Sequence, residues 1–182
     1  SSGIRAITVN EGDDLAWVGI SSGEDDIVLT TALGKIARFH ESEVRPMGRD
    51  AAGVIGIRLA RAGDRVVGMS VVLPEADLLV LTETGYGKRV VNSEFRPKHR
   101  GGQGVRLIAL EGRKTGLVAA VQQVTDEDDE LMLISAGDLT VEGINSAELA
   151  SFRLPVMSGG GFANHVMQIA DAFKKPPFGV VT

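Results

Sequence analysis

Two stretches of the chain repeat each other and decide the fold. Residues 26–54 read DIVLTTALGKIARFHESEVRPMGRDAAGV, and residues 77–105 read DLLVLTETGYGKRVVNSEFRPKHRGGQGV. They align without a gap at an offset of 51 residues. The identical positions include Gly34 and Gly85, Arg38 and Arg89, Glu43 and Glu94, and the Arg-Pro pairs that start at Arg45 and Arg96. A period near 50 residues is typical of propeller-like and solenoid proteins, in which each repeat is one supersecondary unit.

The flanking sequences extend the repeat in both directions. Residues 3–19 resemble residues 53–69 at an offset of 50, and residues 130–149 resemble the start of a further repeat in which FRLPVMSGGGF replaces the basic loop. We therefore expect one domain over residues 1–182, taken from a longer protein. Its repeats are a partial one at 1–20, complete ones at 26–75 and 77–125, and a degenerate one at 130–160. The partial repeat is expected to supply strands to a blade whose other strands come from elsewhere.

Each complete repeat is predicted to hold four short β-strands, because its apolar runs are short and bounded by turn residues. In the first repeat they are DIVLTT, GKIARF, GVIGIRL and GDRVVGMSVV, and in the second DLLVLT, YGKRVV, GVRLIAL and GLVAAVQQV. The glycine between the first two strands indicates a hairpin. A short helix is predicted at 162–175, before Pro176 and Pro177. Trp17 is expected to pack in the core. The predicted fold class is all-β.

Composition excludes several classes of protein. The 182 residues are 43% hydrophobic and 24% charged, as in globular proteins. The absence of cysteine removes disulfides, thiol nucleophiles and sulfur-based zinc sites, and it fits a reducing compartment. No apolar run approaches the roughly 20 residues that span a bilayer, so we expect no membrane partner.

Positive charge is concentrated in the middle of the chain. The formal net charge of the whole chain is -5, but residues 77–125 hold eight Lys/Arg against four Asp/Glu. The segment FRPKHRGGQG, residues 95–104, joins cations to glycines, whose backbone N–H groups can come close to a phosphate. A polyanionic partner responds to such a local field more than to the net charge.

The repeats resemble the C-terminal domain of the A subunit of bacterial DNA gyrase, and topoisomerase IV has similar repeats. The resemblance lies in RPMGRDAAGVIGIRLARAGDRVVGM, GIRAITVNEGDDLAWVG and LVAAVQQVTDEDDELMLIS, and it covers roughly residues 3 to 150. It implies a β-pinwheel, a propeller-like partial ring that bends double-stranded DNA around its rim without catalysing a reaction itself. It also implies two protein partners, the rest of the topoisomerase polypeptide and its ATPase partner subunit, in the bacterial cytoplasm at the nucleoid. No cofactor or metal is expected.

The resemblance and the repeat together give a set of candidate DNA contacts. They are Lys35, Arg38, Arg49, Lys88, Arg89, Lys98, His99, Arg100, Gly101, Gly102, Gln103 and Gly104. The family carries a basic box of the form Gln-basic-basic-Gly-Gly-basic-Gly, and the nearest match is KHRGGQG at 98–104, with Lys98, His99 and Gln103 as departures. Arg45 and Arg96 follow Glu43 and Glu94 by two residues, so an ion pair on one strand face is the alternative for them.

Other interpretations of the sequence are weaker. TDEDDE at 125–130 lacks the ligand spacing of a calcium loop and is expected to be a solvated turn. The three histidines His40, His99 and His165 are dispersed, and Tyr86 has no neighbouring acid or base that would make it a nucleophile. The alternative function is a propeller-like protein-interaction or structural module with little DNA wrapping.

Overall fold

The fold is all-β, as the repeat predicts. The computed structural model describes residues 3–84, 86–124, 134–136, 139–141 and 151–153. Within them there is no α-helix, and two 3-10 turns, η1 (Glu41–Glu43) and η2 (Asn92–Glu94), follow the first two hairpins. The strands are β1 (Asp26–Thr31), β2 (Lys35–His40), β3 (Val66–Val71), β4 (Asp77–Thr82), β5 (Tyr86–Val90), β6 (Val105–Arg106), β7 (Val118–Val124), β8 (Ile134–Ala136), β9 (Leu139–Val141) and β10 (Ser151–Arg153).

Two equivalent hairpins form the centres of two antiparallel sheets. β1 pairs with β2 and β4 pairs with β5, and in each case three residues join the strands. Gly34 closes the first of these loops with φ +74, the left-handed conformation that a three-residue hairpin loop requires. β3 lies on the other side of β1, and β7 lies on the other side of β4. The register shifts at Thr30/Thr31 and again at Leu81/Thr82, one repeat later.

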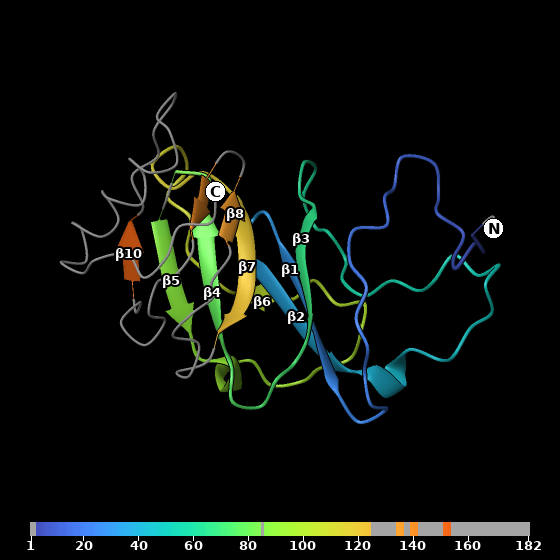
Figure 1. Cartoon of the computed structure of the whole chain (residues 1–182). Helices are drawn as coiled ribbons and strands as arrows, with labels where there is room; N and C mark the ends of the chain where they lie inside the picture. The colour runs from blue at the N-terminus through green and yellow to red at the C-terminus, as the bar shows by residue number, and fades with distance from the viewer. Residues whose placement is uncertain (1–2, 85, 125–133, 137–138, 142–150, 154–182) are drawn as a thin grey trace.

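The fourth strand of each sheet does not come from the same repeat. The first sheet has the order β3-β1-β2-β6, and the second has the order β10-β5-β4-β7. β6 belongs to the second repeat in sequence but pairs with β2, and β10 pairs with β5 in the same way. The prediction of four strands within each repeat is therefore wrong in its connectivity. Backbone groups on the outer edge of a hairpin need a partner, and the next repeat supplies it. Figure 1 shows the two sheets side by side.

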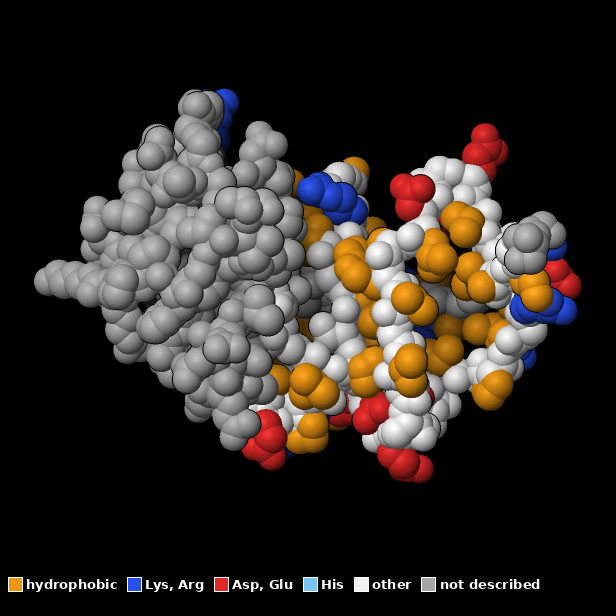
Figure 2. Space-filling model, in the orientation of Figure 1, with side chains coloured by type: hydrophobic (Ala, Val, Ile, Leu, Met, Phe, Trp, Pro, Cys, Tyr) orange, Lys and Arg blue, Asp and Glu red, His pale blue; other side chains and the backbone are white. Residues whose placement is uncertain are grey.

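The strands predicted at 53–59 and within 3–19 are not formed in the described part of the chain. Residues 53–59 are the repeat equivalent of the segment that contains β6, but described residues 3–25, which precede β1, hold no hairpin whose edge they could join. Val54 and Ile55 are accordingly exposed. Trp17 is 40% exposed, so its prediction as a core residue is wrong, and Val18 and Ile20 are more exposed still. Figure 2 shows apolar side chains on the surface of this N-terminal region.

The core lies between the two hairpin sheets. Its buried side chains come from both repeats and include Val28, Ile36, Val72, Leu78, Val80, Val90, Phe95, Leu107 and Val118. The Val118 N–H donates to the Ala32 carbonyl at 2.8 Å. Gln123 bridges the sheets, because it accepts from the Leu73 N–H and donates to the Val71 carbonyl, each at 2.8 Å. The two repeats therefore share one core.

The third repeat is described only in part. β8 and β9 form an antiparallel hairpin near the start of the degenerate repeat predicted at 130–160, and β10 lies near its end. The acidic turn predicted at 125–130 and the helix predicted at 162–175 lie outside the described residues. Among the residues that are described, none forms a helix with the length and hydropathy of a membrane span.

Candidate nucleic-acid interface

The basic loop at 95–104 lies against the first repeat. The Lys98 N–H donates to the Arg38 carbonyl on β2, and the Gly101 N–H donates to the Gly56 carbonyl, each at 2.8 Å. The Arg58 N–H in turn donates to the Gly102 carbonyl at 2.8 Å. The loop thus reaches β6 after it has crossed two segments of the preceding repeat.

Gly104 allows the close approach that places β6 beside β2. Its φ is +68, and a Cβ on this residue would lie 2.6 Å from the carbonyl oxygen of Ile36. Any larger residue would therefore be both strained and in collision with the backbone of the neighbouring strand. Gly101 also has a positive φ of +78, but its surroundings are open by comparison. The glycines of the loop thus serve the fold of the exchanged strand.

Arg100, the central cation of the predicted basic box, forms hydrogen bonds to other residues of the chain. Its Nη1 donates to the Ile55 carbonyl at 2.5 Å, its Nε donates to the Glu43 carbonyl at 3.3 Å, and its backbone N–H donates to Glu43 Oε2 at 2.7 Å. That backbone N–H, followed by the His99 side chain, holds the pKa of the Glu43 carboxyl below its usual value. His99 Nδ1 lies 3.0 Å from Glu43 Oε1, although the His99 side chain is almost fully exposed.

Arg38 and Arg89 form the same ion pair in the two repeats. Arg38 Nη2 lies 2.7 Å from Asp26 Oδ2 across the first hairpin, and Arg89 Nε lies 2.7 Å from Asp77 Oδ2 across the second. All four side chains are at most 20% exposed. Arg38 also donates to the Asn92 carbonyl at 3.1 Å, which links β2 to η2 of the next repeat. These two arginines therefore stabilise the hairpins.

The predicted alternative for Arg45 and Arg96 is not observed. Glu43 bonds to Arg100 and His99 of the next repeat instead of Arg45. In the described part of the chain, neither Arg45 nor Arg96 is within ion-pair distance of a carboxylate. Both side chains are exposed.

Six exposed cations gather on and beside the outer edge of the first sheet, and we call them the basic edge. Among the described residues none of them forms an ion pair. Lys35 on β2 and Arg106 on β6 are directly opposed in register. The members of the basic edge are Lys35, Arg58, Arg61, Arg96, Lys98 and Arg106.

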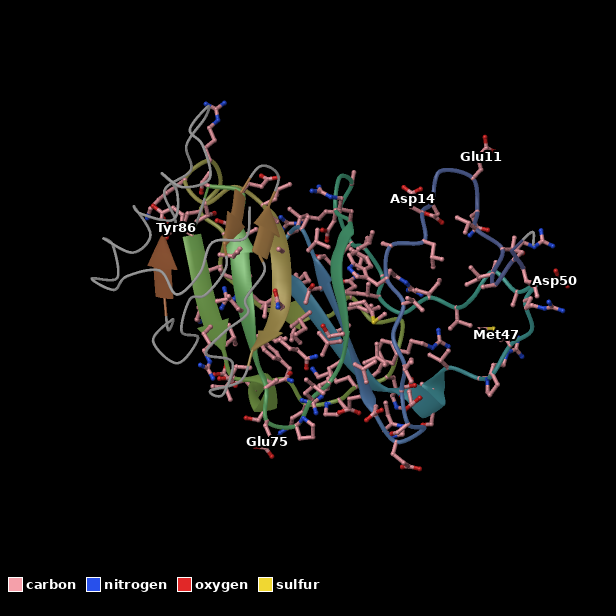
Figure 3. All side chains as sticks on the ribbon, in the orientation of Figure 1. Glu11, Asp14, Met47, Asp50, Glu75 and Tyr86 are labelled. Atoms are coloured by element: carbon pink, nitrogen blue, oxygen red, sulfur yellow. The ribbon has the colours of Figure 1, made fainter. Side chains whose placement is uncertain are left out.

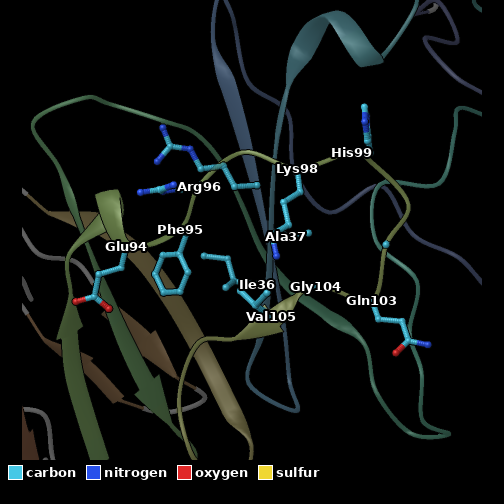
Figure 4. Close-up of a pocket in the computed structure, with 12 residues that line it drawn as sticks. Ile36, Ala37, Glu94, Phe95, Arg96, Lys98, His99, Gln103, Gly104 and Val105 are labelled. Atoms are coloured by element: carbon cyan, nitrogen blue, oxygen red, sulfur yellow. The ribbon is translucent and has the colours of Figure 1, made fainter.

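Two hollows lie along the basic edge. The larger has a volume of about 400 Å³, and its lining includes Phe95, Ile36, Arg96 and Lys98. In Figure 4 the Gln103 side chain leaves this hollow on the side away from Arg96. Gln103 also lines the smaller hollow, of about 120 Å³, together with three members of the basic edge, Lys35, Arg58 and Arg61. The basic edge is therefore continuous across the segment that leads into β6.

The remaining predicted contacts fall into two groups. Lys88 on β5 and Arg49 in the loop after η1 are exposed, but they lie outside both hollows. Gly102 has no positive φ, and its carbonyl holds Arg58 in place. The candidate list from the sequence lacks Arg58 and Arg106, which lie in strands predicted for their own repeats, and Arg61, which lies between two such strands. The signal that could have found Arg106 is its position, two residues after the basic box.

No group of metal-binding side chains is assembled in the described residues. Tyr86 lies at the start of β5, far from the carboxylates Glu11 and Asp14 at the tip of the N-terminal loop (Figure 3). Its ring lies 5.8 Å from Lys114 Nζ, a cation–π contact. Within the same described residues no group of three or more His, Asp or Glu side chains could hold a metal ion.

The described repeats exchange edge strands, share one core and carry a basic outer edge. These features define a propeller-like domain. A family model described as DNA gyrase C-terminal domain, beta-propeller, matches residues 1–22, 25–73 and 76–134. The chain belongs to this family, and its fold is the β-pinwheel of that domain.

Individual relatives agree with the family. The chain is 45% identical over 139 residues to the A subunit of DNA gyrase from Klebsiella oxytoca, which covers 76% of this chain and 16% of that protein. It is 39% identical over 175 residues to the corresponding protein of Staphylococcus epidermidis, which covers 92% of this chain and 19% of that protein. The chain therefore spans less than a fifth of the length of these two relatives.

Solved structures show the same fold. The structure of a DNA gyrase A C-terminal domain matches with a TM-score of 0.73 at 23% identity, over 86% of this chain and 55% of that one. The C-terminal domain of DNA topoisomerase IV matches with a TM-score of 0.68 at 23% identity, over 86% of this chain and 47% of that one.

Proposed function

We propose that this chain is a non-catalytic DNA-binding module in the A subunit of a bacterial type IIA topoisomerase. It bends duplex DNA along its rim and presents the DNA segment to the catalytic core, which works with an ATPase partner subunit in the cytoplasm. The basic edge is the observation that carries this proposal. Six exposed cations without ion pairs in the described chain are arranged along one edge of a sheet, and DNA offers about one phosphate charge per 1.7 Å of its axis.

The predicted contacts have different roles in this proposal. Lys35 and Lys98 belong to the basic edge, and Gln103 lies beside it as an uncharged donor. In this proposal Arg38, Arg89 and Arg100 support DNA binding through the fold, because their guanidinium groups are bonded within the protein. Gly101, Gly102 and Gly104 act in the same way through the loop. Lys88 and Arg49 are exposed cations that add to the positive surface, and His99 is exposed beside Glu43.

A salt titration tests the proposal. If the six cations each neutralise about one phosphate, the logarithm of the affinity for linear duplex DNA should fall against the logarithm of salt with a slope of about -5. Lys98→Ala should make that slope shallower by roughly one and weaken all DNA sequences equally, because a phosphate contact carries no base information.

The matched control is Arg5→Ala. Arg5 is also exposed, but it pairs with Asp50 in the N-terminal region, so its loss changes the net charge without touching the basic edge. Its salt slope should equal that of the unmodified chain. Binding that is absent, or whose affinity does not change with salt, would rule out phosphate-dominated DNA binding and favour the alternative, a protein-interaction module.

A further inference from the structure

The smaller hollow of the basic edge lies where two repeats meet. Lys35, Arg58 and Arg61 belong to the first repeat, and Gln103, which lines the same hollow, belongs to the second. Arg58 is anchored across this junction, since its N–H donates to the Gly102 carbonyl. Both repeats therefore have to be in place before the lining is complete.

The field in this hollow is positive. Its lining holds three cations and one carboxylate, Asp64, which leaves a formal net charge of +2. Asp64 Oδ1 already accepts from the Leu33 and Arg65 N–H groups, each at 2.9 Å. Since neither Lys35 nor the two arginines pairs with Asp64 in the described chain, the carboxylate stabilises the turn and leaves the cations available.

The pairing of β6 with β2 places a fourth cation, Arg106, opposite Lys35. Lys35 and Arg106 are directly opposite each other on β2 and β6, and both are exposed. Like charges at such a cross-strand position destabilise the pairing of two strands. Lys35 also lines the hollow, so an anion bound there that approaches both side chains would remove this destabilisation.

We propose that this hollow is a phosphate seat that two repeats build together, formed by Lys35, Arg58, Arg61 and Gln103, with Arg106 opposite Lys35 on β6. Its volume of about 120 Å³ corresponds to roughly four water molecules, which suits one phosphate group and not a base. Occupation of the seat fastens β6 to β2, so that a polyanion strengthens the contact between successive repeats. The seat rests on the proposed function, because a phosphate of bound DNA is the expected occupant.

The first experiment uses the whole chain with Arg61→Ala, Lys35→Gln and the control Arg5→Ala. Arg61→Ala should lower the affinity for duplex DNA about tenfold, since hydrogen bonds to charged groups are the strong ones. It should also make the salt slope shallower by roughly one. Lys35→Gln should weaken DNA binding too, but without DNA it should raise the Tm by about 1–3 °C, because it removes the repulsion from Arg106. A purely structural lysine would lower the Tm instead.

The second experiment separates the sources of the phosphate. Thermal unfolding is followed with inorganic phosphate, with duplex DNA, and with chloride at the same ionic strength. A rise in Tm with inorganic phosphate that Arg61→Ala removes would support a seat that takes a free anion. A rise with DNA alone, again removed by Arg61→Ala, would support a seat for phosphodiesters.

This design distinguishes failure of the phosphate seat from failure of the proposed function. If the unmodified chain binds DNA with a steep salt slope while Arg61→Ala and Lys35→Gln behave like Arg5→Ala, the seat is overturned and the proposed function stands. If the unmodified chain shows no salt-dependent DNA binding and no response to phosphate, both proposals fail.

Discussion

The outer edge of the first sheet pairs Lys35 with Arg106, whereas the equivalent edge of the second sheet pairs Tyr86 with Arg153. The hairpins that carry these edges are alike. Each hairpin carries an Asp–Arg ion pair and receives an edge strand from further along the chain. The comparison shows that positions shared by the two repeats form the hairpin and its ion pair, whereas positions that they do not share, such as Lys35 and Tyr86, differ in charge at the edge strand of each hairpin.

The largest effect is expected at Gly104, compared with its repeat equivalent Gly53. Both have a positive φ, but a Cβ at Gly104 would meet the Ile36 carbonyl at 2.6 Å, whereas at Gly53 the nearest atom is 3.9 Å away. Gly53→Ala should cost about 1 kcal/mol of unfolding free energy and Gly104→Ala about 3 kcal/mol, measured by urea denaturation. Equal losses would show that β6 does not need this close approach.

The Asp–Arg ion pairs should have the next largest effect, and an equal one in both sheets. Arg38→Met and Arg89→Met each leave a largely buried aspartate without this partner, which should cost about 2 kcal/mol in the same denaturation experiment. Lys88→Met is the control, because Lys88 is a cation on the same strand as Arg89 but is exposed, and it should cost little. If the two arginines prove as neutral as Lys88, their role is not structural and they return to the set of direct DNA contacts.

Gln123 should matter more than the residue beside it, because it joins the two sheets. Gln123→Ala removes the hydrogen bonds to Leu73 and Val71 and should cost about 1–2 kcal/mol. Gln122→Ala, on the same strand and without such a bridge in the described residues, should be close to neutral. Hydrogen exchange at the Leu73 amide should report the loss directly, and unchanged protection there would contradict the bridge.

The smallest effect is a pH dependence that comes from Glu43 in the first repeat. The pKa of Glu43 is lowered in the folded state, first by the Arg100 N–H and then by His99. A carboxyl group of this kind adds stability above its unfolded pKa, near the ordinary value of 4.5, and that stability disappears as the pH falls further through the folded pKa. Glu43→Gln should therefore flatten the fall in Tm below pH 4.5.

The repeat equivalent of Glu43 provides the control for this measurement. Glu94 is exposed, and its carboxylate accepts no hydrogen bond among the described residues. Glu94→Gln should leave the acid limb of the Tm profile as it is in the unmodified chain. Identical profiles for Glu43→Gln and the unmodified chain would show that the contact of Glu43 with the basic loop contributes no acid sensitivity.

The sequence by itself determined the repeat, the hairpins and the all-β class. Short apolar runs and turn glycines act over a few neighbouring residues, so their pattern is legible without knowledge of what lies beside them. The same alignment located the basic loop at 95–104 and drew attention to Lys35 and Lys98. It also paired Arg38 with Arg89 as equivalent residues, although it assigned both to DNA.

Only the tertiary structure decided which strand completes each sheet and which cations remain available. An edge strand is selected by whichever backbone groups are left unpaired nearby, and that depends on how successive repeats pack. For this reason β6 joins β2 of the preceding repeat, and residues 53–59 remain outside any strand in the described chain. The same packing buries Arg38 against Asp26, occupies Arg100 with the Ile55 carbonyl, and brings Arg58 and Arg61 beside Lys35. Charge is visible in a sequence, but whether a charge is already paired depends on residues that folding brings together from distant parts of the chain.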